Sequence, residues 1–226
     1  MRLPKILLAA CMLLSFGAHA ESPSIPATVV PKNYKVVETI RGDLNKDGQE
    51  DIVLLIKATD LSQWVKDERG QKVDRNRRGL IVLLKNGEKY EPVLKNLNCF
   101  ASENEDGGVY FPPELEILIK KSNLLIEYGH GRYGYWTYTF RLQNGDFELI
   151  GYDHSSNRGP VVESFTSINL LSQKMLRKIN TNQDAQGGDE RFKESWSKLK
   201  PFKPIRLAAI TAFDEFSVKR ALGVSD

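Results

Sequence analysis

The chain contains 226 residues, 41% of them hydrophobic and 27% charged, and its formal net charge is +3. A charge so near neutral gives no reason to expect nucleic acid or an anionic membrane as a partner. The length supports one sizeable core, so we expect residues 34–226 to form a single β-rich domain.

The first 20 residues are predicted to be a signal peptide. Arg2 and Lys5 form a positive start, residues 6–16 are apolar, and residues 18–20 (Ala-His-Ala) have the small-x-small pattern of a cleavage site. Cleavage there implies an exported protein, periplasmic or secreted, and no other stretch is long enough to be a transmembrane segment. Residues 21–33 contain three prolines and are typical of an extended lead-in.

A second processing route starts from residues 8–11 (Leu-Ala-Ala-Cys), which resemble a bacterial lipobox. That route would anchor the protein through a lipid on Cys11. Only five residues separate Lys5 from Cys11, which is short for the apolar core of a signal, so simple cleavage is favoured. Cys99 is then the only cysteine, which leaves no intramolecular disulfide, and we expect it to be a small buried side chain.

The most informative stretch is a nine-residue loop between two predicted strands, residues 34–40 and 52–56. Its oxygen donors recur at loop positions one, three, five, seven and nine, and Gly48 stands at position six, where a sharp turn is needed. The expected ligands are the side chains of Asp43, Asn45, Asp47 and Asp51 and the backbone carbonyl of Gln49. Ca²⁺ binds six to eight such oxygens, and three carboxylates this close repel one another without a cation. The loop therefore predicts one structural Ca²⁺, and the alternative is a polar turn without an ion.

This pattern differs from an EF-hand, because position twelve is Leu54 rather than glutamate and strands flank the loop. It resembles the calcium loop of FG-GAP or VCBS-type repeats, D-x-[DN]-x-D-G-x-x-D followed by an apolar strand, over residues 42–57. The resemblance implies a β-sheet context and recognition of a protein or glycan partner. One copy is present, whereas a β-propeller repeats its blade several times.

Residues 61–79 are dense in charges of alternating sign, and we expect a flexible loop or a short exposed helix between two buried strands. Hairpin signals then recur every 10–15 residues, including Asn-Gly turns at 86–87 and 144–145. The predicted strands are 80–85, 88–94, 114–120, 124–128, 133–142, 147–152, 161–170 and 174–179. The fold class is therefore all-β, mainly an antiparallel meander, as a sandwich, a barrel or a partial propeller.

The last part of the chain is predicted to be mostly irregular with a short helical segment. Residues 180–188 are typical of a loop, and Asp189 could cap a short helix that ends at Leu199. We expect an edge strand in residues 205–210 and a helical turn within residues 213–222.

A glycine-rich turn at 129–134 leads into an aromatic strand, and period-two alternation divides that strand into two faces. Trp136, Tyr138 and Phe140 share the face that we expect to pack in the core. The weaker candidates for ligand contact lie on or near the other face: His130, Arg132, Tyr133 and Tyr135.

Catalytic patterns are scarce. Residues 153–156 (Asp-His-Ser-Ser) are adjacent, which rarely produces a catalytic triad, and we interpret them as a polar loop after a strand. Residues 103–108 form a second acidic loop whose spacing does not match the first. The leading hypothesis is an exported calcium-binding β-protein with a non-catalytic binding or scaffolding role. The alternatives are an envelope hydrolase of glycan or peptide and an inhibitor or immunity-type protein that contacts its partner through residues 61–79.

Overall fold

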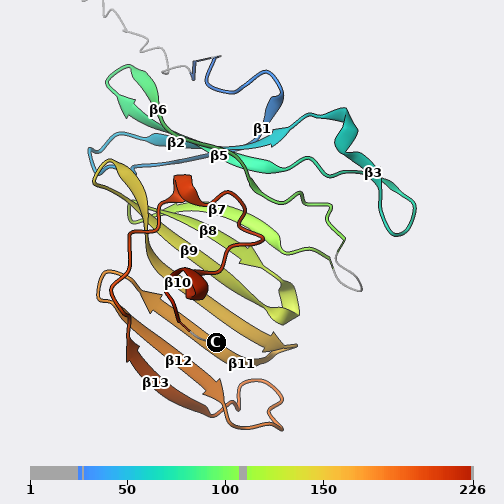
Figure 1. Cartoon of the computed structure of the whole chain (residues 1–226), viewed down its shortest axis with the longest axis vertical. Coiled ribbons are helices and arrows are strands. Elements are labelled where there is room, and N and C mark those ends of the chain that lie inside the picture. The colour runs from blue at the N-terminus through green and yellow to red at the C-terminus, as the bar shows by residue number, and fades with distance from the viewer. Residues whose placement is uncertain (1–24, 27, 107–110, 225–226) are drawn as a thin grey trace, which may run out of the picture.

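The computed structural model describes residues 25–26, 28–106 and 111–224. The predicted signal peptide and Cys11 lie outside the described residues, as does the first part of the lead-in. Two antiparallel sheets dominate the fold, so the prediction of an all-β class is confirmed. The sheets do not close into a barrel (Figure 1).

The first sheet has four strands in the order β1-β2-β5-β6. The strands are β1 (Tyr34–Gly42), β2 (Asp51–Ala58), β5 (Arg78–Asn86) and β6 (Lys89–Phe100). A separate two-stranded hairpin projects from its end, formed by β3 (Trp64–Lys66) and β4 (Lys72–Asp74) after a 3₁₀ turn at Leu61–Gln63. The predicted loop or helix over 61–79 is therefore corrected to a small hairpin, which we call the arm and define as residues 61–74.

The second sheet has seven strands in the order β13-β12-β11-β10-β9-β8-β7, a meander of sequential neighbours. Its strands are β7 (Glu114–Lys120), β8 (Asn123–Gly129), β9 (Gly134–Gln143), β10 (Asp146–Arg158), β11 (Val161–Asn169), β12 (Lys174–Asn180) and β13 (Phe192–Lys198). The Asn-Gly turns fall between β5 and β6 and between β9 and β10, as predicted.

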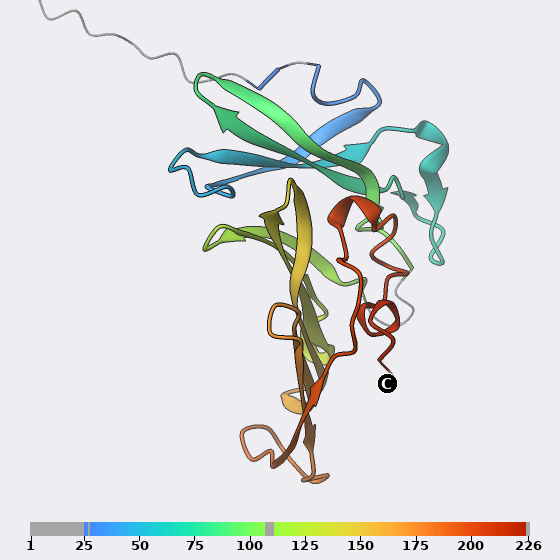
Figure 2. The ribbon, with the colours of Figure 1, turned by 60° about the vertical axis from the view of Figure 1, so that its left-hand side comes forward.

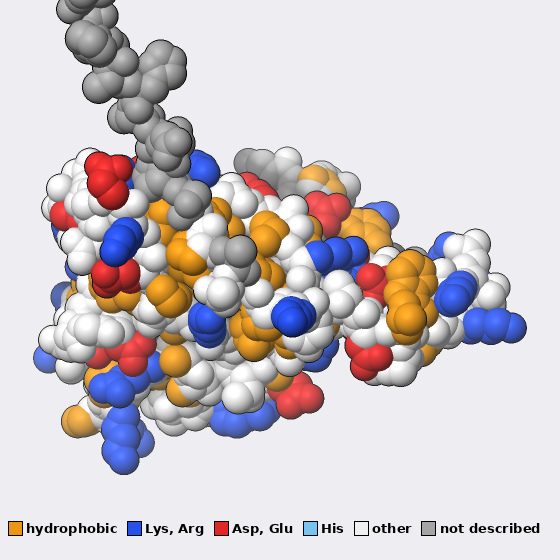
Figure 3. Space-filling model, turned by 90° about the horizontal axis from the view of Figure 1, so that it is seen from above, with side chains coloured by type: hydrophobic (Ala, Val, Ile, Leu, Met, Phe, Trp, Pro, Cys, Tyr) orange, Lys and Arg blue, Asp and Glu red, His pale blue; other side chains and the backbone are white. Residues whose placement is uncertain are grey.

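The four-stranded sheet is covered on both faces, which explains the continuous apolar runs of its two central strands. One face of β2 and β5 packs toward the seven-stranded sheet, through residues such as Val53 and Val82. The other face carries isoleucine and leucine side chains, among them Ile52 and Ile81, which pack against Val29. Figure 3 shows hydrophobic side chains gathered on this outer side. The second half of the lead-in thus covers a sheet rather than extending freely.

The seven-stranded sheet is covered on one face only. The C-terminal segment, residues 199–224, runs along that face and includes a 3₁₀ turn at Leu207–Ala209 and helix α1 (Val218–Ala221) (Figure 2). Phe213 of this segment joins the two sheets, because its ring centroid lies 5.1 Å from that of Phe100 in β6 and 5.0 Å from that of Tyr138 in β9. The main core therefore lies between the sheets and the C-terminal segment.

The two sheets also touch directly where β1 meets β7. A Cβ atom added to Gly42 would lie 2.7 Å from the Cγ2 atom of Ile119. Only glycine fits there without displacement of a neighbour, and this residue immediately precedes the predicted calcium loop.

Three further predictions for local structure were wrong. Residues 192–198 form strand β13 instead of a helix, because pairing with β12 supplies the backbone hydrogen bonds. Residues 153–156 continue β10 instead of forming a loop, because pairing with β9 and β11 on its two sides supplies the backbone hydrogen bonds. The expected edge strand at 205–210 is reduced to a single bridge between Arg206 and Glu148.

Candidate functional site

The predicted calcium loop connects β1 to β2, and its two ends are fixed in the sheet. Asp51 is the first residue of β2 and is fully buried, and Leu44 near the other end is 2% exposed and belongs to the main core. Between them the backbone turns through left-handed conformations at Lys46 (φ 66°) and Gly48 (φ 81°). Glycine adopts this conformation without strain, which explains its place at the sixth loop position.

The polar side chains of the loop bend inward onto the loop's own amides. Asp43 accepts hydrogen bonds from the backbone amides of Lys46 (2.6 Å) and Gly48 (3.1 Å). Asn45 accepts one from the amide of Asp47 (3.1 Å), and Asp47 accepts one from the amide of Gln49 (2.7 Å). The bond from the Gln49 amide, and then a bond that the Asn45 side chain donates (2.9 Å), lower the pKa of Asp47 below its ordinary value. Side chain-to-amide bonds of this kind make the turn compact without a regular helix or strand.

Asp51 closes the loop from beneath. Its carboxylate accepts hydrogen bonds from the backbone amides of Leu44 (2.7 Å) and Lys85 (2.9 Å), so that it holds the loop to β5 as well as to β2. Burial raises the pKa of Asp51 despite these bonds. A buried carboxylate of this kind is stabilised in its charged form by any cation placed next to it.

The donor set fits a hard cation, because it combines three carboxylates with a side-chain amide and a backbone carbonyl. Both oxygens of Asp43 and of Asp51 accept one hydrogen bond each and have room for a second contact, whereas Asp47 Oδ2 already accepts two, from the Asn45 side chain (2.9 Å) and the Gln49 side chain (3.3 Å). Within the described residues, however, no three His, Cys, Asp or Glu side chains are gathered closely enough to hold a metal ion. The loop carries the right ligands, and its side chains are engaged with its own backbone.

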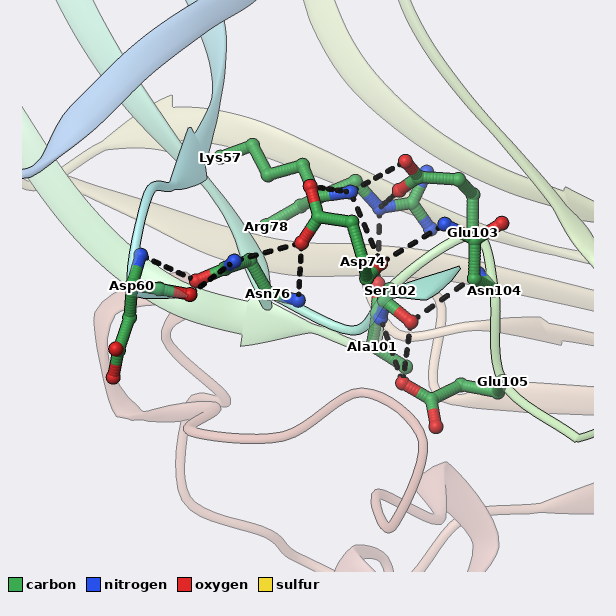
Figure 4. Close-up of polar contacts among 10 residues, drawn as sticks. All are labelled: Lys57, Asp60, Asp74, Asn76, Arg78, Ala101, Ser102, Glu103, Asn104 and Glu105. Carbon is green, nitrogen blue, oxygen red and sulfur yellow. Dashed lines mark hydrogen bonds and ion pairs between the residues drawn. The ribbon is translucent and has the colours of Figure 1, made fainter. Parts of the chain in front are cut away.

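A second polar constellation lies at the base of the arm (Figure 4). Lys57, on β2, is 3% exposed, and its ammonium group lies between two carboxylates, 3.0 Å from Asp74 Oδ2 and 2.5 Å from Glu103 Oε1. Arg78 on β5 lies 3.7 Å from Glu103 Oε2 and donates a hydrogen bond to the carbonyl of Ala101 (2.9 Å). We call these residues, together with Asn76, the arm-base cluster. Three segments that are distant in the sequence converge there.

Asn76 completes the cluster and fixes the two ends of the arm. Its side chain is 1% exposed, donates to the Asp60 carbonyl (2.9 Å) and to Asp74 Oδ1 (2.7 Å), and accepts from the Asp60 amide (2.9 Å). Burial alone would raise the pKa of Asp74, but bonds from Asn76 and then from Lys57 outweigh it, and the pKa is lowered. Burial lowers the pKa of the Arg78 guanidinium. The cluster is an ionised network that anchors the arm.

A cleft of about 690 Å³ separates the arm from the loop that follows β6 and from the β8–β9 connection. Its charged and aromatic lining includes Arg69 of the arm, Glu103, Phe111, Arg132 and Tyr133. The acids that line the cleft from the loop after β6 have structural partners. Glu103 pairs with Lys57, Glu105 accepts from Ser102 Oγ (2.7 Å), and Asp106 pairs with Arg75.

The four weaker candidates for ligand contact divide into two places. Arg132 and Tyr133 line the arm cleft, and the His130 ring packs beside them, with Nε2 3.0 Å from the Phe111 carbonyl and its ring centroid 5.2 Å from that of Tyr133. Tyr135 instead lies in a separate hollow of about 590 Å³, among Glu116 and other residues on the open face of the seven-stranded sheet. The four side chains therefore do not form one site.

The aromatic face expected to pack in the core does so. Phe140 is fully buried, Tyr138 is 3% exposed, and Trp136 stacks on Tyr128 with ring centroids 5.2 Å apart. The prediction for Cys99 is also confirmed, because the side chain is fully buried, and its burial raises the thiol pKa to about 12.

Comparisons of the chain with family models, curated proteins and solved structures find no match. Within the part of the chain that the structure describes, no helix has the length and apolar character needed to cross a membrane.

Sequence reasoning does not find the arm-base cluster. The charge pattern places Asp74 and Arg78 among the solvated charges of residues 61–79, and Lys57 stands at the end of an apolar strand without an evident role. One signal is present in the sequence. A single lysine at the end of the buried run 51–57 requires a carboxylate partner, because an unpaired buried ammonium is costly.

Proposed function

We propose that this is an exported β-protein whose 43–51 loop binds one Ca²⁺ as a structural ion, and that its role is binding rather than catalysis. The observation that carries the proposal is the environment of Asp51. A fully buried carboxylate lies beneath a loop whose other acids, Asp43 and Asp47, already bend inward. A divalent cation would offset both the burial of one charge and the mutual repulsion of all three.

The residues that would hold the ion are Asp43, Asn45, Asp47 and Asp51, with the Gln49 carbonyl. When bound, Ca²⁺ supplies positive charge at the bend between β1 and β2. All ligands come from one contiguous loop, whereas a catalytic metal keeps an open position toward a cleft. A structural role therefore suits the loop better than a catalytic one. The FG-GAP or VCBS resemblance supports recognition of a protein or glycan partner.

The alternative of an envelope hydrolase needs acids that are free to act as general acid and base or nucleophile. The acids that line the arm cleft from the loop after β6, Glu103, Glu105 and Asp106, are engaged in ion pairs and hydrogen bonds. This engagement favours the binding role.

Thermal unfolding with Ca²⁺ and with a chelator tests the proposal. An ion bound only by the folded state stabilises it by about 2.7 kcal/mol at a hundredfold excess over Kd. Asp47→Ala should abolish this difference. The matched control is Asp67→Ala, because Asp67 accepts similar turn bonds from the amides of Arg69 (3.0 Å) and Gln71 (2.7 Å) in the arm, outside the loop.

Two outcomes would contradict calcium binding at this loop. Unfolding of the wild type could be the same with Ca²⁺ and with chelator. Alternatively, Asp47→Ala could retain the full ion-dependent stabilisation, which would place the ion elsewhere. Equal stabilisation by Mg²⁺ would contradict the choice of ion, because Mg²⁺ prefers strict octahedral geometry with retained waters.

Protein recognition through the arm is a second candidate role. The arm is anchored by buried groups, yet it exposes Leu61 (82%) and Trp64 (43%), and the Lys72 ammonium lies 5.7 Å from the centroid of the Trp64 ring. A rigid element with exposed apolar side chains loses little conformational entropy on binding. Leu61→Ser with Trp64→Ser should leave stability unchanged and remove binding to any protein ligand identified. A ligand that still binds the double variant would contradict this role.

A further inference from the structure

Strand β13 ends the seven-stranded sheet and is exposed along its whole length. All seven residues, Phe192–Lys198, are exposed, and among the described strands β13 pairs with β12 alone. Figure 1 shows β13 at the outer border of the sheet. Such an edge presents a row of unpaired backbone groups that can pair with another strand. Its most exposed large apolar side chain is Trp196, at 66%.

The outward-facing backbone groups belong to the even-numbered residues. Hydrogen bonds run from the Leu199 amide to the Gln173 carbonyl (2.9 Å) and from the Thr181 amide to the Arg191 carbonyl (2.7 Å). These bonds flank β13 at its two ends, and both use odd-numbered residues on the β13 side. Because hydrogen-bonded pairs alternate along an antiparallel ladder, the odd residues bond to β12. Even residues therefore direct their N–H and C=O groups toward the free edge.

The even residues also carry their side chains on the open face of the sheet. In the register with β12, Glu194 lies opposite Lys178 and forms an ion pair with it (2.5 Å), and Trp196 lies opposite Leu176. Lys198, in contrast, lies opposite Lys174, a like charge. Like charges directly opposite each other destabilise a sheet, so Lys198 lacks a favourable cross-strand neighbour within its own sheet.

Charges on an edge strand usually prevent association. The order of charges on β13 instead makes one pairing with itself favourable. In an antiparallel arrangement with Trp196 of both copies on the two-fold axis, each Glu194 lies opposite Lys198 of the other copy. Among symmetric registers that pair even residues with even residues inside β13, only this one places Glu194 opposite a lysine. A shift of two residues one way places Glu194 opposite Trp196, and a further shift places it opposite itself.

We infer that β13 is a dimerisation edge, and that the occupant is β13 of a second copy in this register. The interface is isologous, because a residue at position i contacts position j and the reverse also holds. It contains two Glu194–Lys198 pairs, a Trp196–Trp196 contact and the backbone bonds of the even residues. The two seven-stranded sheets then form one continuous sheet. A contact of one strand belongs with small interfaces, below about 1,200 Å² in total, so we expect micromolar to millimolar affinity.

Charge reversal tests the register directly, with sedimentation velocity of the purified protein across micromolar to millimolar concentration as the measurement. Wild type is expected to show a concentration-dependent dimer. Glu194→Lys alone places lysine opposite lysine twice, and Lys198→Glu alone places glutamate opposite glutamate twice. Each single variant should dimerise at least about tenfold more weakly, since two attractive pairs become repulsive.

Mixing the two single variants is the matched control. Lysine at position 194 of one chain then lies opposite glutamate at position 198 of the other, and the second pair retains its native signs. A heterodimer should form at near wild-type affinity although each variant alone dimerises at least about tenfold more weakly. Circular dichroism should show that both variants are folded, and recovery on mixing is itself independent evidence of an intact fold.

Three results would overturn the inference. The wild type could remain monomeric at millimolar concentration. The single variants could dimerise as well as wild type, which would place any dimer elsewhere. The mixture could remain monomeric although the single variants are weakened, which would exclude this register.

Discussion

The two sheets of this protein are both antiparallel, but they are covered differently. The four-stranded sheet is enclosed, with the main core on one face and residues around Val29 on the other. The seven-stranded sheet has the C-terminal segment on one face only, and its outer strands become steadily more exposed toward β13. Similar interactions should therefore contribute very different amounts to stability in the two sheets, because desolvation sets their magnitude.

The largest difference is expected for lysine ion pairs. Lys57→Ala, in the enclosed sheet, leaves Asp74 and Glu103 without their shared cation and should destabilise the protein by about 3–5 kcal/mol. Lys178→Ala removes a surface pair with Glu194 and should cost at most about 1 kcal/mol. Urea unfolding of both variants measures the two values. Equal losses of stability in the two variants would show that burial does not make ion pairs contribute differently in the two sheets.

The second difference concerns apolar side chains. Ile81 on β5 is fully buried in the outer cluster, and Ile81→Ala should destabilise the protein by about 2–5 kcal/mol. Ile179 on β12 is 38% exposed, and Ile179→Ala should stay within about 0.5 kcal/mol of wild type. The same urea experiment compares them. A small loss at Ile81 would mean that the outer face of the four-stranded sheet is not covered in solution.

The smallest effect is a pH dependence within the partly covered sheet. Burial, and then the charge of Lys219, lowers the pKa of His154 on β10. The folded state therefore prefers the neutral ring, and the resulting stability is present above the unfolded pKa of about 6.5. It is lost as the pH falls to the lower pKa of the folded state. Urea midpoints at about pH 7.5 and about pH 5.5 should differ less in His154→Gln than in wild type. An unchanged difference in the variant would assign the pH dependence to other groups.

The enclosed sheet is the easier one to predict from the sequence. Continuous apolar runs at 52–56 and 80–84, with an Asn-Gly turn shortly after the second run, identify β2 and β5 because burial on both faces requires such runs. In the seven-stranded sheet the apolar sequence pattern weakens toward the strands that are least buried. Residues 153–156 are all polar, so nothing in their sequence distinguishes them from a loop. Residues 192–198 show no alternation strong enough to outweigh the helix preference of their lysine and glutamate residues.

The candidate sites show the same division. The loop at 43–51 can be predicted, because its polar residues are contiguous and their spacing has a physical meaning. The arm-base cluster joins Lys57, Asp74 and Glu103 from three segments, and only the fold brings them together. The separation of Tyr135 from the arm cleft cannot be predicted either, since it depends on a 3₁₀ turn at Gly131–Tyr133 that redirects the chain before β9 begins.

The buried thiol of Cys99 is a built-in probe of local unfolding. Cys99 lies near the end of β6, and its backbone carbonyl accepts a hydrogen bond from the Phe213 amide (2.8 Å). Burial raises the pKa of the Cys99 thiol to about 12, so the thiol stays protonated and unreactive at neutral pH. Because the side chain is fully buried, an alkylating reagent can reach this sulfur only after the core around it has opened. The rate of thiol modification therefore reports how often the core around β6 opens.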